Sequence, residues 1–254
     1  MSAPHSFIER SRQAFTDLVR DQGLQAAAVT VRARPLSTEE AIGQPGRRDF
    51  PLIKGKERLL EAVVGQSRGN AFTDAPREFT GSVEELLALP LDDPRNRGLY
   101  IAALNAAFRS AGLVGGTVHC RDDDPERCAR EIAAVVDLRL RWHRVGLIGF
   151  NPAIAEELAR RFGPAWLRIT DLDPDNVGSE RFGVPIWEGE HRFRELIAWA
   201  DGVLMTGSTF VNGTFDTLRE ATEQAHKPMI LYGVTAAALA HLFGFDRLCP
   251  CARG

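Results

Sequence analysis

Short apolar runs alternate with amphipathic stretches through the second half of the chain. Buried strands are predicted over 144–150, 201–207 and 227–233, and a further strand over 165–175 that ends in acidic residues. Apolar side chains at helical spacing follow each run. Strands that alternate with helices indicate a parallel sheet with right-handed crossovers. The second half is therefore predicted to resemble a Rossmann-type domain.

The first half mixes helical and extended patterns. Apolar spacing predicts a helix over 7–22, followed by a strand over 24–34. A second strand is expected near Leu52. The stretch 54–65 predicts a short helix that ends at Gly65, which is a suitable helix C-cap.

Helix signals continue after an expected loop over 69–79. Ser82 and Glu85 have the spacing of a capping box, which predicts a short helix after Ser82. A longer helix is predicted over 95–112. These helices, together with the strands before them, give the first half an α+β pattern.

The pattern changes near residue 140, which predicts a domain boundary there. Just before it, Asp124 and Pro125 begin a helix, with Asp124 at the N-cap and proline in the first turn. The predicted fold class is α/β, with an α+β front domain over 1–140 and a Rossmann-like parallel-sheet domain over 141–254. A cleft between two packed domains is a usual place for a small-molecule site.

Composition and charge exclude several classes of protein. The chain has 254 residues, 44% of them hydrophobic, which suits one or two globular domains. Its formal net charge is −3 with basic residues spread along the chain, so no nucleic-acid partner is expected. The chain has no run of about 18 apolar residues and no apolar signal region. We therefore expect no membrane association, and we expect a cytoplasmic location. A homodimer is expected from the general frequency of such assemblies alone.

Ligands of parallel sheets bind beyond the carboxyl ends of the strands. At the first such end, Gly149 allows a tight turn before a helix N-terminus, where free N–H groups attract anions. Phe150 and Pro152 crowd the position of a pyrophosphate, which argues against ordinary NAD binding. At the second end, Asp171 lies near the usual position of a ribose-binding acid. Asp173 precedes a proline, so a solvated turn is an equally open interpretation of this stretch.

The stretch after the next strand is rich in small polar residues. Its candidate ligand-binding residues are Thr206, Gly207, Ser208, Thr209, Asn212, Gly213 and Thr214. Glycines permit positive φ, and hydroxyl and backbone N–H groups can converge on an anion or a polar head group. Ordinary helix capping explains the same residues, and the sequence leaves both interpretations open.

Two further sets of residues are candidates for binding. His119 and Cys120 offer an imidazole and a thiolate to a divalent or heavy metal, although the cysteine spacing matches no known zinc pattern. Buried structural thiols are the commoner role of such cysteines and are the alternative interpretation. In the front half, Lys54 is a candidate for an anionic ligand, with a solvated lysine as the alternative. The polar wall facing the second domain is expected to come from Asn70, Thr73 and Asp74.

Taken together, six stretches resemble a known family. In chain order they read IKGKERLLEAVVG, GNAFTD, TVHCRDDDPERCA, VGLIGFNP, DLDP and TGSTFVNGT. This set is similar to the putative heavy-metal chelation family, over roughly residues 25 to 250. The resemblance implies an enolase-N-terminal-like front domain, a Rossmann-like second domain and a site in the cleft between them. Asn70 stands where the family pattern has Gln, one methylene longer.

Two functional hypotheses follow. The first is a module that binds a small anionic or metal-chelating molecule in the interdomain cleft, with a role in heavy-metal chelation. The second is an enzyme of small-molecule or metal-cofactor metabolism, with Asp74 or His119 as general acid or base. A structural or regulatory protein with a decayed nucleotide pocket is a third interpretation. Because the sequence has no nucleophile elbow, H-E-x-x-H or Walker A motif, it names no reaction.

Overall fold

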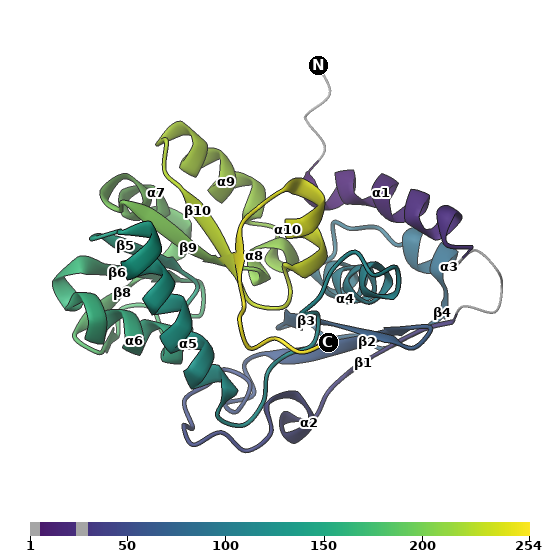
Figure 1. Cartoon of the computed structure of the whole chain (residues 1–254), viewed down its shortest axis with the longest axis horizontal. Helices are drawn as coiled ribbons and strands as arrows, with labels where there is room; N and C mark the ends of the chain where they lie inside the picture. The colour runs from purple at the N-terminus through teal and green to yellow at the C-terminus, as the bar shows by residue number, and fades with distance from the viewer. Residues whose placement is uncertain (1–5, 24–29) are drawn as a thin grey trace.

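The computed structural model describes residues 6–23 and 30–254 (Figure 1). Residues 24–29, where most of the first predicted strand falls, lie outside the described part. The front half builds a four-stranded antiparallel sheet in the order β3-β2-β1-β4. Its strands are β1 (Thr30–Pro35), β2 (Arg58–Val64), β3 (Ser67–Thr73) and β4 (Phe79–Ser82).

The helix predicted over 54–65 is wrong, because most of this stretch is strand β2. Leu60, Ala62 and Val64 belong to one hydrophobic cluster and Leu59 to another, so successive side chains point to opposite faces with period two. Val64 pairs with Ser67 across a two-residue turn that fixes this register. The expected strand near Leu52 is a turn, and the loop expected over 69–79 holds the end of β3 and the start of β4.

The predicted helices of the front half are present. They are α1 (Phe7–Asp21), α3 (Val83–Leu87) with its capping box, and α4 (Pro94–Ser110). A short helix that was not predicted, α2 (Thr38–Ile42), is also present. Helix α4 packs directly on β3. A Cβ at Gly69 would lie 2.3 Å from the Ala102 carbonyl oxygen and 2.3 Å from the Ala106 nitrogen, so glycine permits this close approach.

The second half builds a seven-stranded sheet in the order β11-β10-β9-β5-β6-β8-β7, parallel apart from β7. Its strands are β5 (Val145–Ile148), β6 (Leu167–Asp171), β7 (Glu180–Arg181), β8 (Val184–Glu188), β9 (Gly202–Thr206), β10 (Met229–Tyr232) and β11 (Arg247–Leu248). The predicted mixed α/β fold with a parallel sheet is confirmed. Strands β7, β8 and β11 were not predicted.

Helices cover both faces of this sheet (Figure 1). They are α5 (Asp124–Val135), α6 (Pro152–Phe162), α7 (Gly189–Trp199), α8 (Ser208–Asn212), α9 (Phe215–Gln224) and α10 (Ala237–Phe243). A π-helical stretch (Val136–Leu140) extends α5, and a 3₁₀ turn (Pro164–Trp166) follows α6. The N-cap of α5 is Asp123 rather than the predicted Asp124, whose carboxylate instead pairs with Arg127 and Arg253.

The parallel strands divide their side chains between two hydrophobic cores. Leu147 and Leu204 pack with the buried faces of α5 and α6. Val203 and Met205 belong to a second core with α7, α9 and α10. This second core continues without interruption into α1, α4 and one face of the four-stranded sheet.

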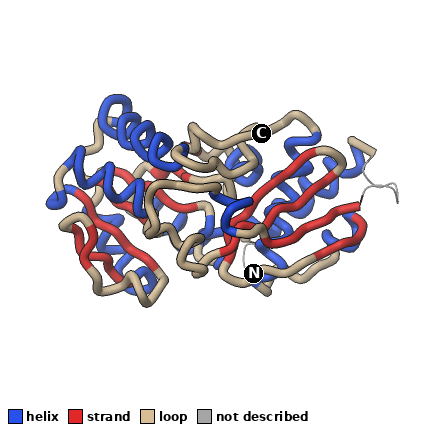
Figure 2. Tube along the Cα trace, turned by 90° about the horizontal axis from the view of Figure 1, so that it is seen from below, coloured by secondary structure: helices blue, strands red, loops and turns tan. Residues whose placement is uncertain are grey.

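The two sheets form separate groups of strands (Figure 2) and are tied together by buried polar contacts. The Asn105 amide of α4 donates to the carbonyls of Asn70 (2.9 Å) and Val234 (3.2 Å) and accepts from the Ala238 N–H (2.8 Å). The Phe72 N–H donates to the Thr235 hydroxyl (3.0 Å). Buried polar groups that are fully paired hold a single arrangement. In the described part of the chain, no helix is both long and apolar enough to cross a bilayer.

Candidate functional site

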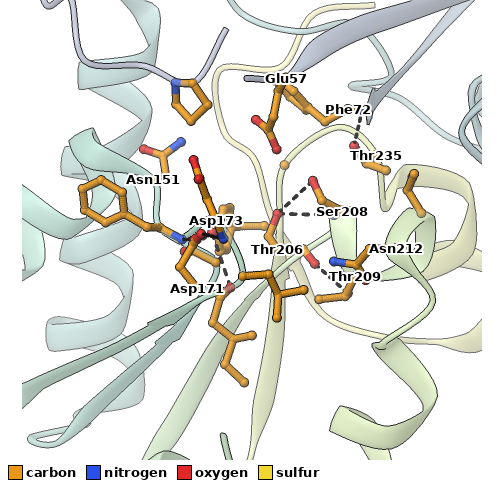
Figure 3. Close-up of a pocket in the computed structure, with 18 of the residues that line it drawn as sticks. Glu57, Phe72, Asn151, Asp171, Asp173, Thr206, Ser208, Thr209, Asn212 and Thr235 are labelled. Atoms are coloured by element: carbon orange, nitrogen blue, oxygen red, sulfur yellow. Dashed lines mark hydrogen bonds between the residues drawn. The ribbon is translucent and has the colours of Figure 1, made fainter. Parts of the chain in front are cut away.

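A cavity of about 620 Å³ lies between the two sheets. The front half contributes the turn at 50–57 and the end of β3, and α5 contributes part of one wall. The floor comes from the carboxyl ends of β5, β6, β9 and β10 (Figure 3). Strands β5 and β9 are neighbours, and the chain leaves them toward opposite edges of the sheet. Such a switch point opens a crevice at the strand ends.

Asp171 organises the turn at the end of β6. Its Oδ2 accepts the Phe150 N–H (2.5 Å) and its Oδ1 accepts the Asp173 N–H (2.7 Å). Burial raises the pKa of this carboxyl, while the two backbone hydrogen bonds oppose the rise. Asp171 thus holds the turns after β5 and β6 together, and part of its hydrogen-bonding capacity is already used.

Glu57 is the functional candidate that sequence reasoning missed. It lies in the turn before β2 and reaches from the front half toward Asp171 and Thr206 (Figure 3). Burial, followed by the charges of Asp171, Asp74 and Asp173, raises the pKa of Glu57 to about 7. The sequence analysis did not select Glu57 because it placed this residue in the helix predicted over 54–65. A helix there would not direct this side chain at the opposite sheet. Four carboxyl groups, which we call the carboxylate end of the cavity, therefore converge: Glu57, Asp74, Asp171 and Asp173.

Most of the small polar residues after β9 serve local structure. The Thr209 hydroxyl donates to the Thr206 carbonyl (2.7 Å), and the Asn212 side chain accepts from the N–H (3.1 Å) and hydroxyl (2.7 Å) of Thr214. Ser208 instead turns its hydroxyl toward Thr206 at 3.4 Å, a long contact (Figure 3). Because the Thr206 hydroxyl also accepts the Ser208 N–H (3.3 Å), the Ser208 hydroxyl is the more available of the two to a ligand.

Gly149 is required by the backbone rather than by a ligand. Its φ is +88°, and a Cβ there would lie 2.5 Å from Cγ2 of Thr206. The Tyr232 hydroxyl donates to the Gly149 carbonyl (2.7 Å) and holds this turn against β10. The turn thus joins β5, β9 and β10 at the floor of the cavity.

Fourteen of the residues proposed from the sequence line this one cavity. They are Thr73, Asp74, His119, Cys120, Gly149, Phe150, Asp171, Asp173, Thr206, Ser208, Thr209, Asn212, Gly213 and Thr214. Lys54, Asn70 and Gly207 are not among the lining residues. The Asn70 side chain is fully buried, and its Oδ1 accepts the His119 N–H (2.9 Å), which is a structural role.

The two predicted metal ligands, His119 and Cys120, are deeply placed. Burial lowers the pKa of His119 to about 4, and its Nδ1 lies 3.2 Å from the Ala41 carbonyl oxygen. Burial also raises the pKa of the Cys120 thiol, which is 4% exposed. Among the described residues, one group of three potential ligands has its ligand atoms within 4.8 Å of one another, namely Glu188, Glu190 and His191. Among the described residues, His119 and Cys120 thus have no third potential ligand atom within this distance of both.

The charge of the cavity is negative. Besides the carboxylate end, Glu190 lines the cavity, and the lysine among the lining residues is Lys56. The Lys56 ammonium pairs with Asp175 across the two halves. Since burial keeps His119 neutral near pH 7, little positive side-chain charge faces the interior.

A comparison with family models relates the second half of the chain to one known family. Residues 134–247 match the model of DUF364, described as "Putative heavy-metal chelation". No curated protein matches the chain.

Two solved structures of DUF364 proteins, both titled as of unknown function, resemble the chain. The Pyrococcus horikoshii protein is 15% identical, with a TM-score of 0.50 over 91% of this chain and 80% of its own. The Desulfitobacterium hafniense DCB-2 protein is 16% identical, with a TM-score of 0.48 over 91% of this chain and 84% of its own. At this identity the first likeness concerns the fold alone.

Proposed function

We propose that the cavity binds a small metal-chelating molecule together with its cation. The observation that carries this proposal is the convergence of Glu57 with Asp74, Asp171 and Asp173 from two halves of the chain. A ligand that brings positive charge relieves the repulsion among these groups. The description of the DUF364 family as a heavy-metal chelation family agrees with this class of ligand.

The geometry favours a chelate over a bare ion. In the part of the chain that the structure describes, the cavity carboxylates do not form a group of three within mutual ligand distance. An ion held here would therefore have to bring most of its ligands with it. The negative lining argues against the purely anionic ligand expected from the small-residue turn. It favours a chelator with amine or hydroxyl groups that carries no net negative charge with its metal.

We also propose a finer assignment of the two halves to known folds, based on strand order and helix packing. The parallel strands follow the order β8-β6-β5-β9-β10-β11, which is the strand order of a doubly wound dinucleotide-binding sheet. This order supports a Rossmann-like second domain over 141–254. The antiparallel sheet with α4 on one face supports an enolase-N-terminal-like front domain over 1–140. Helix α5 lies before residue 140 but packs on α6 of the second half.

One observation favours an enzyme as the second candidate function. Glu57 has a pKa raised to about 7, where a general acid or base works best near neutral pH. No hydrogen bond occupies its carboxyl group among the described residues. A substrate in the cavity would meet this group directly, so proton transfer on a bound molecule is the reaction class to test.

The first experiment is to purify the protein without chelators and to measure bound metal and released small molecules by mass spectrometry. Equal amounts of a metal and a small chelator are expected, and both should fall in a Glu57→Gln variant. A Glu180→Gln variant is the matched control, because Glu180 is exposed on β7 and is not a lining residue. A released organic compound without metal would favour the enzyme. Protein that releases neither compound, and that a panel of cationic chelates fails to stabilise, would contradict the chelate proposal.

A further inference from the structure

All four cysteines of the chain gather in one hydrophobic core beside the same cavity. Cys120, Cys128 and Cys251 are 4%, 8% and 7% exposed and belong to one hydrophobic core, against which Cys249 packs. All four are free thiols. Cys120, Cys128 and Cys249 line the cavity, so an ion can reach them from it.

The C-terminal segment brings these thiols together. Val118 and Arg253 exchange backbone hydrogen bonds of 2.9 and 2.8 Å, and the Arg253 guanidinium pairs with Asp124 at 2.7 Å. These contacts hold the segment around Cys249 against α5, which carries Cys128. The thiols therefore converge although more than a hundred residues separate Cys128 from Cys249 in the chain.

Cys128 is the centre of the group. Its thiol lies beside those of both Cys249 and Cys251. The Arg127 Nε–H donates to the Cys251 sulfur at 3.3 Å, so that sulfur already has a partner. Cys128 and Cys249 are thus two neighbouring thiols that both line the cavity, whereas Cys251 does not line it.

We propose that Cys128 and Cys249 form a two-thiolate site for a soft cation such as Cu(I). Thiolate sulfur selects soft ions of this kind over Mg²⁺ or Mn²⁺. In the described residues no three cysteines lie within mutual ligand distance, which disfavours a tetrahedral zinc site and suits an ion that accepts two ligands. Two Cu–S bonds form on binding, and the thiol protons leave to solvent. This inference uses none of the carboxylates and so does not depend on the proposed function.

The test is anaerobic titration of the reduced full-length protein with Cu(I) against a coloured Cu(I) chelator. One equivalent should bind in the wild type, and a Cys128→Ala/Cys249→Ala variant should lose it, with at least a hundredfold weaker binding. Cys120→Ala is the matched control, since Cys120 is also buried and lines the cavity, but makes no hydrogen bond to Cys128. Glu57→Gln should bind Cu(I) as the wild type does.

A second measurement on the wild type avoids reliance on the fold of the variants. Bound Cu(I) should protect Cys128 and Cys249 from alkylation, as located by peptide mass spectrometry. Undiminished Cu(I) binding by a folded double variant would overturn the proposal. So would loss of binding in Glu57→Gln alone, which would place the ion at the carboxylate end. A Cys128–Cys249 disulfide in protein purified without oxygen would also overturn it, because it would assign the pair to redox chemistry.

Discussion

The two ends of the cavity differ in the donor atoms that they present and in the residues that surround those atoms. The carboxylate end carries hard oxygen donors at the carboxyl end of β6 and in the turn before β2. The thiol end, made of the four cysteines, carries soft sulfur donors within the hydrophobic core. In the sheet order, β10, β9 and β5 stand between β11, which precedes Cys249, and β6, which ends at Asp171.

Because of this difference, one cavity can hold two binding chemistries. Oxygen donors keep their charge near water or beside polar hydrogen bonds, whereas thiols tolerate an apolar surrounding as neutral groups. The protein separates the two by several strands, so an ion or chelate that suits one end does not suit the other. Substitutions in the backbone, at single titratable groups and at single ligand residues test whether the two ends are distinct.

The largest effect is expected from the backbone at the carboxylate end. Gly149→Ala places a Cβ 2.5 Å from Thr206 at a φ of +88°, and should lower the free energy of unfolding by roughly 2–5 kcal/mol. Gly233→Ala at the thiol side is the matched control. Its φ is +92° with no atom within 4 Å of the added Cβ, so only about 1–2 kcal/mol is expected. Urea unfolding of both variants measures the difference, and equal losses would show that the contact with Thr206 is easily relieved.

The next effect is the dependence of stability on pH. Glu57 has its pKa raised to about 7 by burial, whereas an unfolded glutamate titrates near 4.5. Between these values the unfolded chain loses a proton that the folded chain keeps, so stability falls as pH rises from about 4.5 to about 7. The free energy of unfolding should fall by at most roughly 1–3 kcal/mol over this range, because solvent reaches this partly buried group and weakens the effect.

Glu57→Gln should remove this slope in urea unfolding measured at a series of pH values. His119→Asn is the contrasting variant. Burial lowers the pKa of His119 to about 4, so His119 costs stability as pH falls from about 6.5 to about 4, with the opposite sign. A slope that survives in Glu57→Gln would mean that another carboxyl group carries the raised pKa.

Two probes should distinguish the ends by ligand preference. A Ni(II)–triethylenetetramine complex, which is a dication, should bind the wild type and bind Glu57→Gln roughly tenfold more weakly, about 1.4 kcal/mol. The Cys249→Ala variant should bind this complex like the wild type and should lose affinity for Cu(I). Calorimetry with each probe on each variant gives the crossed comparison. If one variant weakened both probes equally, the two ends would be a single site.

The smallest effect is expected at Lys56, whose ammonium pairs with Asp175 on the surface. Surface ion pairs contribute little to stability, so Lys56→Met should leave the thermal midpoint unchanged within error. Removal of this positive charge should tighten binding of the cationic complex by roughly two- to fivefold, and less at high salt. Binding that weakened instead would show that the Lys56 side chain contacts the ligand itself.

The apolar pattern of the sequence is sufficient to predict most elements of the second half, though not β7, β8 and β11, and the strand ends that form the floor of the cavity. Apolar runs such as 144–150 are buried from both faces, so their pattern can only be a parallel strand, and the turns that follow must lie at one edge. For this reason Asp171, Asp173 and Thr206 were predicted as candidates and do line one cavity.

Which residues lie opposite this floor depends on tertiary contacts. Residues 58–64 satisfy helical and extended spacing about equally, and only pairing with β3 and packing on α4 make them strand β2. This choice directs Glu57 at Asp171. The meeting of Cys128 with Cys249 likewise depends on the Val118–Arg253 pairing of the C-terminal segment. Local sequence encodes neither contact, because each depends on the closing of a long stretch of chain by the folded whole.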